Sequence, residues 1–316
     1  MSTVSIAFEK AQAEDRAALV GYLPAGFPDK ETAIRAALAM CEAGADVIEV
    51  GLPYSDPLMD GPVIADAVYH ALKGGTRIAD VLDTVSAIAD AGTAALIMTY
   101  WNPVDRYGAD AFARDLASAG GAGLITPDLT PEEAGPWLAA SDAHHLDRVF
   151  LVAPSSTQAR IEQITKLCRG FVYAVSLMGI TGTKEAVSSV AGGTVARIRE
   201  HTELPVAVGL GVNTAAQAAE VAAFADGVIV GSAFVRRLAQ APGPDEAVAA
   251  VRALTADLAE GVRRPRLSPR AKGRAPAGGL RSEGAKRPSD EGAGRGLERP
   301  EASGGILSVY APGVHP

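Results

Sequence analysis

The sequence has few of the residues that mark disulfide-stabilised, metal-binding or membrane-spanning proteins. Its 316 residues include two cysteines and five histidines. Cys41 and Cys168 have no paired spacing, which favours small apolar core residues in a reducing compartment. The histidines show no ligand spacing, so no metal site is predicted. No apolar run approaches the length of a membrane span and no signal peptide is visible, so we expect a cytoplasmic protein.

The chain also lacks an excess of positive charge. Its formal net charge is −8, which argues against a nucleic-acid partner. Residues 262–316 differ from the rest, because they are rich in Arg, Pro, Gly and Ala and carry 11 Lys and Arg against 5 Asp and Glu. Such a segment has too few large apolar groups to form a core, so the sequence predicts a folded domain at 1–261 and a disordered basic tail at 262–316. The tail is either a solvated appendage or a binding arm.

What the sequence does contain is a regular alternation of short apolar runs and helical patterns. The runs lack strict two-residue alternation, as expected for parallel strands covered on both faces. Eight such units in about 260 residues fit a (β/α)8 TIM barrel with extra helices. A doubly wound open sheet is the alternative, but the first turn, "GYLPAGFPD", has no G-x-G-x-x-G pattern. The expected strands are Ala18–Leu23, Asp46–Leu52, Ala94–Tyr100, Gly123–Thr126, Arg148–Val152, Phe171–Ser176, Pro205–Gly211 and Gly227–Val230.

Helices are expected between these strands, and Asp29 is placed to cap the first of them after the opening strand. An additional helix at Thr3–Gln12 is expected before the barrel begins. The others are predicted at Val63–Leu72, Ile78–Ala89, Asp110–Ser118, Pro131–Ala139, Thr157–Leu167, Val190–Glu200, Ala215–Ala222, Phe234–Gln240 and Asp245–Glu260.

Two carboxylates stand out in the stretch "EVGLPYSDPLMDGPVI". Glu49 lies near the end of the second strand, and if Ile48 and Val50 face the helices it points into the barrel mouth, where active sites of such barrels lie. Burial there raises the pKa of a carboxylate toward the range useful for proton transfer. A satisfied interior ion pair is the alternative for Glu49. Asp60, just before Gly61-Pro62, is either a helix N-cap or the second half of a carboxylate pair.

Glycines gather at three consecutive strand ends. They lie at Gly179–Gly182, at Gly209–Gly211 and at Gly231, which Ser232 follows at a helix start. Glycine backbone and helix N-termini bind anions, and TIM barrels often hold phosphate after strands seven and eight. The sequence therefore favours a phosphate site over ordinary turns.

Three tyrosines, Tyr22, Tyr100 and Tyr173, lie at or near the ends of strands one, three and six. They either pack at the barrel rim or contact a flat aromatic ligand. No nucleophile-elbow motif supports a Ser-His-Asp triad.

Several of these motifs together resemble the tryptophan synthase alpha chain family. The resemblance rests on "EVGLPYSDPLMDGPVI", "SLMGITG", "VGLGV" and "DGVIVGSA", in order between Ala18 and Glu260. It implies cleavage of indole-3-glycerol phosphate to indole and glyceraldehyde 3-phosphate, with Glu49 as general acid and base. It further implies that Asp60 accepts the indole N–H and that Tyr173 lies near the reacting centre. The phosphate-binding positions that it implies are Gly182, Gly211, Gly231 and Ser232, and the indole-pocket positions are Tyr22, Tyr100 and Thr181.

The resemblance also implies a partner. Asp56, Asn102 and Asp128 match segments that face the beta chain in an α2β2 complex, where the beta chain carries pyridoxal phosphate and receives indole. The alpha chain would need no cofactor. Pro53–Asp60 and Leu177–Val187 resemble two mobile loops, although Leu177 replaces an arginine of some relatives. Another phosphate-binding barrel of the same pathway and a non-catalytic binding subunit are the alternatives.

Overall fold

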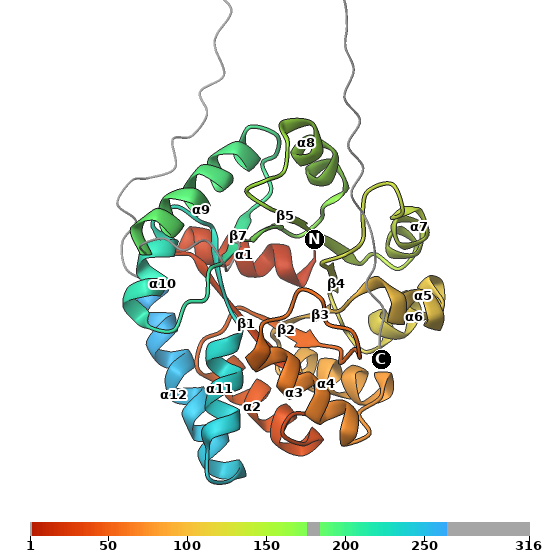
Figure 1. Ribbon diagram of the computed structural model, residues 1–316, viewed down its shortest axis with the longest axis vertical. Helices are drawn as coiled ribbons and strands as arrows, with labels where there is room; N and C mark the ends of the chain where they lie inside the picture. Colours follow the sequence, from red (N-terminus) through yellow and green to blue (C-terminus); the bar gives the residue numbers. More distant parts are fainter. Residues whose placement is uncertain (1, 176–183, 264–316) are drawn as a thin grey trace, which may run out of the picture. The chain divides into compact units, whose positions relative to one another are not determined.

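Eight parallel strands close into a barrel in the order of the sequence, from β1 through β8 and back to β1 (Figure 1). The computed structural model describes residues 2–175 and 184–263. The closed order confirms the predicted TIM barrel and excludes the open doubly wound sheet. The strands are β1 (Ala18–Pro24), β2 (Val47–Gly51), β3 (Ala94–Met98), β4 (Gly123–Thr126), β5 (Asp147–Val152), β6 (Val172–Val175), β7 (Val206–Gly209) and β8 (Gly227–Val230).

Helices surround the barrel, and one further helix precedes β1 (Figure 1). The helices of the described part of the chain are α1 (Thr3–Ala13), α2 (Lys30–Glu42), α3 (Pro62–Lys73), α4 (Ile78–Asp90), α5 (Trp101–Tyr107), α6 (Ala109–Ser118), α7 (Gly135–Ala143), α8 (Gln158–Leu167), α9 (Lys184–Arg199), α10 (Ala215–Ala222), α11 (Ser232–Gln240) and α12 (Pro244–Val262).

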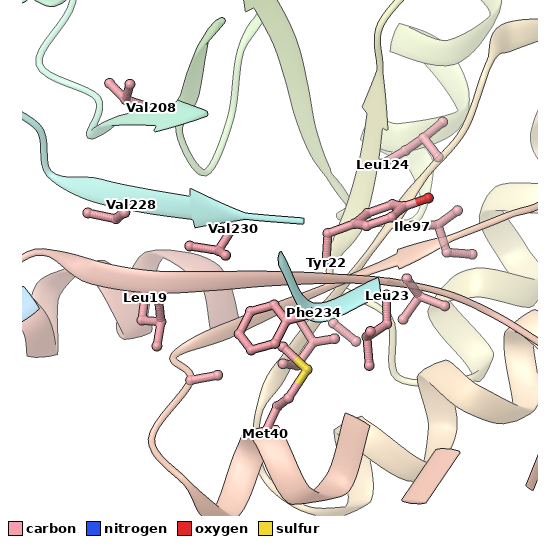
Figure 2. Packing of buried hydrophobic residues seen from close by; sticks show 14 of the residues in the cluster. Leu19, Tyr22, Leu23, Met40, Ile97, Leu124, Val208, Val228, Val230 and Phe234 are labelled. Carbon is pink, nitrogen blue, oxygen red and sulfur yellow. The ribbon is translucent and has the colours of Figure 1, made fainter. Parts of the chain in front are cut away.

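Local sequence sets both the limits and the packing of these helices. Asp29 caps α2 as predicted, since its carboxylate accepts a hydrogen bond from the Thr32 N–H at 2.8 Å. Glycine at position 21 of β1 then lets α2 and α11 approach the sheet, because a Cβ there would collide with Met40 and lie 3.3 Å from Phe234. Figure 2 shows these two side chains together beneath β1.

Besides the core between the strands and the helices, a second apolar cluster fills the inside of the barrel. Helix α1 closes the N-terminal end of the barrel. Val4 and Phe8 of α1 join this cluster with inward residues such as Val47. The ring of Phe8 lies 5.2 Å from that of Phe171. The N-terminal end of the barrel is therefore filled, and only the C-terminal end is left to hold a ligand.

A buried ion pair joins the segments that lead into β1 and β2, at the N-terminal end of the barrel. Arg16 binds Asp46 through two hydrogen bonds of 2.6 and 2.8 Å. Asp46 also accepts the Leu19 N–H at 2.8 Å. Two parallel bonds of this kind hold a fixed geometry, so the pair sets the register of β1 against β2.

Three helices differ from the sequence-based expectation. Helix α5 was not predicted; it begins at Trp101, directly after the residue at which the predicted third strand ends, and β3 itself ends at Met98. Helix α7 begins four residues later than predicted, since Pro136 fits its first turn whereas residues 131–133 form a turn. Helix α9 begins at Lys184 rather than Val190.

The end of the barrel falls at α12. This helix continues to Val262, whose side chain is buried in the core. Residues 264–316, which make up nearly all of the predicted tail, lie outside the described residues, so disorder there stays a prediction. No described helix is long and apolar enough to cross a membrane.

Candidate active site

Glu49 occupies the centre of β2 and points into the barrel. Its register partners are Tyr22 on β1 and Leu96 on β3, and Leu96 belongs to the inner cluster. Ile48 and Val50 belong instead to the outer core that packs under the helices. The predicted orientation of Glu49 is therefore confirmed.

The Glu49 carboxyl is buried inside the barrel. The residue is 1% exposed, and its Oε1 has no hydrogen-bond partner among the described residues. An interior ion pair, the alternative interpretation, is not found within the described part of the chain. Burial raises the pKa of this carboxyl to about 8, because the charged form loses its hydration. A carboxyl with that pKa both gives and takes a proton near neutral pH.

Asp60 lies at the end of the β2–α3 loop and does not cap the helix. The N-cap residue of α3 is Gly61, which has no side chain that could cap the helix. Burial raises the pKa of Asp60 to about 6, and a hydrogen bond with Tyr100 lowers it in part. The Tyr100 hydroxyl also accepts the Met59 N–H at 2.8 Å. Tyr100, which follows β3, therefore holds the loop that carries Asp60.

Two further tyrosines, Tyr22 and Tyr173, lie near both carboxylates. Burial raises the pKa of Tyr22 and of Tyr173 well above the usual range, and the charges of Glu49 and Asp60 add to both shifts. The four groups are thus close enough to sense one another. They form a mouth with two acids and two hydrogen-bonding phenols.

Glycines at neighbouring strand ends make room for both phenols. A Cβ at Gly51 would collide with the Tyr22 hydroxyl, and one at Gly209 would lie 2.7 Å from the Tyr173 hydroxyl. The other end of the Tyr22 side chain lies against Gly231, whose added Cβ would be 3.4 Å from the ring. Tyr22 therefore spans the short distance from the carboxylate side of the mouth to its glycine side.

A cleft of about 310 Å³, part of it open to solvent, lies on the carboxylate side. Tyr22, Asp60 and Tyr100 line it, as do residues that the sequence did not single out. Those are at or after the ends of β2, β3 and β4, which is the signal that could have identified them. They are Leu52, Tyr54, Met98, Thr99 and Pro127, together with Val68 of α3.

The glycine side combines a left-handed turn and a helix start. Gly211 follows β7 with φ +65, a conformation that favours glycine. Gly231 ends β8 and precedes Ser232, the first residue of α11, with no side-chain cap at that end. The free N–H groups of such a start favour an anion. Gly182 and Thr181, predicted to complete the site, lie outside the described residues, as does Leu177.

In chemical terms the mouth holds a near-neutral acid, a second carboxylate and anion-binding backbone at one end of a barrel. No group of three His, Cys, Asp or Glu residues suited to a metal ion occurs among the described residues. The arrangement fits proton transfer on a phosphorylated, partly aromatic molecule.

Comparisons with known proteins agree with this geometry. The family model for the tryptophan synthase alpha chain matches residues 8–263. The chain belongs to the tryptophan synthase alpha chain family. The alpha chain of Salinispora arenicola is 61% identical over 265 residues, covering 84% of this chain and 99% of the relative. That of Mycobacteroides abscessus is 60% identical over 257 residues, covering 81% and 96%.

Solved structures give the same result. A Mycobacterium tuberculosis tryptophan synthase structure matches with a TM-score of 0.77 at 55% identity, covering 83% of this chain and 98% of that one. The alpha subunit from Legionella pneumophila str. Paris matches at 0.76 and 32% identity, covering 83% and 98%.

Tryptophan synthase alpha chains catalyse cleavage of indole-3-glycerol phosphate to indole and glyceraldehyde 3-phosphate, and this is the activity of the chain. The match decides against the other phosphate-binding barrels and against a non-catalytic subunit.

The three residues predicted to face the beta chain of tryptophan synthase follow three consecutive strands: Asp56 and Asp128 lie in the loops after β2 and β4, and Asn102 lies in the first turn of α5, which follows β3. Asp56 is exposed in the β2–α3 loop. Asn102 donates to the Tyr54 hydroxyl at 3.2 Å, and Asp128 accepts the Trp101 N–H at 2.8 Å. These contacts join the segments after β2, β3 and β4 into one rim.

Proposed function

We propose that Glu49 is the proton donor and acceptor for the cleavage of indole-3-glycerol phosphate. The observation that carries the proposal is a carboxyl that is buried, unpaired at Oε1 and directed into the open end of the barrel. Its pKa of about 8 keeps most of it protonated at neutral pH, ready to act first as an acid.

The reaction needs one proton to be given and one to be taken back. Glu49 protonates C3 of the indole ring, and the ring becomes cationic. The resulting carboxylate then removes the proton of the side-chain hydroxyl next to C3. The O–H electron pair forms the aldehyde C=O, the C–C bond breaks, and its electrons return to the ring. Glu49 ends protonated, and no water is consumed.

Asp60 and Tyr173 assist from the two sides of the ring. The Asp60 carboxylate accepts the indole N–H and stabilises the positive charge that develops after protonation at C3. Its pKa of about 6 leaves it mostly ionised at pH 7, while Glu49 is mostly protonated. Two carboxyls with separated pKa values can thus take opposite roles. Tyr173 lies near the reacting carbon, and Tyr22 and Tyr100 pack on the indole.

The phosphate end of the substrate binds to main-chain amides. Gly211, Gly231 and Ser232 supply them, together with Gly182, and Thr181 contributes to the indole pocket. The helix start at Ser232 favours the negative charge. Tyr22, which touches both sides of the mouth, indicates that one small molecule can reach from Glu49 to these amides.

We also propose that the rim formed by Asp56, Asn102 and Asp128 binds the beta chain in an α2β2 complex. Alpha chains of this family carry no pyridoxal phosphate themselves; that cofactor belongs to the beta chain, which uses the indole. We place the reaction in the cytoplasm, in line with the two free cysteines.

Glu49→Gln tests the chemical part, because the amide keeps the shape and cannot exchange the proton. Indole formation is expected to fall by at least about 10³-fold, a loss comparable with removal of a general acid–base group. Binding of glycerol 3-phosphate, measured by calorimetry, is expected to stay within about twofold. Near-normal turnover would refute the assignment.

Ser232→Asp tests the phosphate part. A negative charge in the first turn stabilises the helix but repels the phosphoryl group. We expect an unchanged or higher melting temperature and a loss of glycerol 3-phosphate binding. The matched control is Ser232→Asn, which is similar in size but neutral. Equal binding by the two variants would contradict an anion site here.

An assay of the full-length chain with and without a beta chain tests the partnership. Indole formation is expected to rise when the beta chain is added. The Asp56→Ala variant is expected to need more beta chain for half of that rise. Activity that is independent of the beta chain at every concentration would refute the proposal.

A further inference from the structure

The loop between β7 and α10 carries Gly211, and it is tied down by the side chain of Asn213. The Asn213 Nδ2 donates to the Gly211 carbonyl oxygen at 2.6 Å. The Asn213 N–H in turn donates to the Gln217 side-chain oxygen at 2.8 Å. Asn213 is therefore fixed to the first turn of α10 and holds the peptide between Gly211 and Val212.

A third contact joins this loop to the helix on the other side of the mouth. The Arg236 guanidinium on α11 donates to the Asn213 Oδ1. Arg236 lies four residues after Ser232, so both are on the same face of α11, and side chains of a helix lean toward its N-terminus. The Asn213 side chain thus bridges Gly211 on one loop and the helix that begins at Ser232.

Hydrogen bonds rather than packing hold this bridge. A hollow of about 380 Å³ lies beside it, lined by Asn213, Ala233, Arg236, Arg237, Gln240 and Leu254. Asn213 is only partly buried. Val212 anchors the loop in the core, whereas Gly211 is exposed, so the bridge is what orients the turn at Gly211.

We propose that Asn213, held by Arg236, is a positioning residue that sets the turn at Gly211 against the start of α11 and so fixes affinity for the phosphoryl group. The inference rests on the proposed phosphate site. Backbone amides bind an anion well only when their directions are already fixed, because ordering a loop on binding costs free energy. The bridge orders the loop in advance.

The reverse reaction separates this role from a general structural one, since it uses two substrates and only one carries phosphate. With the full-length chain, we measure the KM of glyceraldehyde 3-phosphate at saturating indole, and that of indole at saturating aldehyde. Asn213→Ala is expected to raise the first about tenfold, the size of effect expected for losing a hydrogen bond to a charged group. The KM of indole and kcat are expected to stay within about twofold.

Arg236→Ala is expected to have a similar effect on the KM of glyceraldehyde 3-phosphate. The double variant is expected to be no worse than either single variant, because each breaks the same bridge. Arg237→Ala is the matched control: it removes an equal charge from the adjacent position of α11, and no hydrogen bond of Arg237 is found within the described residues. It is expected to leave all three constants unchanged.

Each other outcome overturns the inference in a recognisable way. Multiplying effects of the two single substitutions would mean that Asn213 and Arg236 act separately. A fall in kcat with a rise in both KM values would mean that Asn213 supports the fold and not the phosphate site. If Asn213→Ala were normal while Ser232→Asp lost phosphate binding, the positioning role would fail and the proposed function would stand. If Ser232→Asp also bound normally, the phosphate site itself would be wrong.

Discussion

Glu49→Gln should make the protein more stable as it removes the activity. The ordinary pKa of a glutamate is 4.5, and burial raises that of Glu49 to about 8. Between these two pH values the Glu49 carboxyl of the folded chain therefore keeps a proton that the unfolded chain releases. Each pH unit between the two values corresponds to about 1.36 kcal/mol. Ionisation of Glu49 in the unfolded chain therefore lowers the free energy of unfolding by about 3 kcal/mol at pH 7 and by about 5 kcal/mol above pH 8. Glutamine cannot ionise, so the variant does not lose this free energy.

The sign of the effect follows from proton binding. Between pH 4.5 and 8 the unfolded chain binds fewer protons at residue 49 than the folded chain, so this group makes stability fall as pH rises. Below pH 4.5 both states are protonated and the group contributes nothing. The difference in free energy of unfolding between Glu49→Gln and the parent should thus be small at pH 4.5 and grow toward pH 8.

Urea unfolding followed by circular dichroism, at half-unit steps from pH 4.5 to 8.5, measures that difference. Glu203→Gln is the matched control, because Glu203 is exposed and the same chemical change there should give parallel curves. Parallel curves for Glu49→Gln as well would refute the reasoning. They would mean that Glu49 ionises in the folded chain as easily as in the unfolded one.

Three other effects should follow from the site and its supports. The plot of kcat/KM against pH should be bell-shaped. It should rise near pH 6 as Asp60 ionises and fall near pH 8 as Glu49 loses its proton. Asp60→Asn should remove the rising limb along with most of the activity. Tyr100→Phe should move the rising limb to higher pH, because the hydroxyl lowers the pKa of Asp60; an unmoved limb would exclude this contact. Asp46→Asn should destabilise the fold by about 2 kcal/mol in urea, because it removes the charged bidentate partner of the buried Arg16 and leaves the Glu14 carboxylate, at 2.6 Å, as an acidic partner; an unchanged midpoint would contradict the role of that pair.

The barrel could be predicted because its signals are local. Apolar runs of four to seven residues gave the strands, and β4 and β8 have the predicted bounds. The helix limits were harder where composition is uniform. Pro131, which also suits a helix start, precedes α7 by four residues, the glycines within α9 weaken its helical pattern, and α5 has only seven residues.

The candidate site was predictable to the extent that chemistry follows position along a strand. Alternation put Glu49 inside the barrel, and the glycines at the ends of β7 and β8 indicated an anion. The contact of Tyr100 with the Met59 N–H could not be predicted, because it joins residues 41 positions apart. The same holds for the bond between Asn213 and Arg236, which no periodicity encodes. Tertiary contacts between loops decide these details.

Strand β2 and the residue before it carry two carboxylates, one that stabilises the fold and one that takes part in the proposed proton transfer. Asp46 precedes its first residue and lies at the filled end of the barrel, where Arg16 and the Leu19 N–H bind both of its oxygens. Glu49, three residues on, lies at the centre of β2 and points into the barrel, and its Oε1 has no partner among the described residues. A partner for Glu49 like that of Asp46 would stabilise the charged form and lower its pKa, and the carboxyl would then give up its proton below neutral pH. Proton donation to the indole ring therefore depends on Glu49 remaining unpaired, and the arginine that would stabilise the fold at this position would also abolish the reaction.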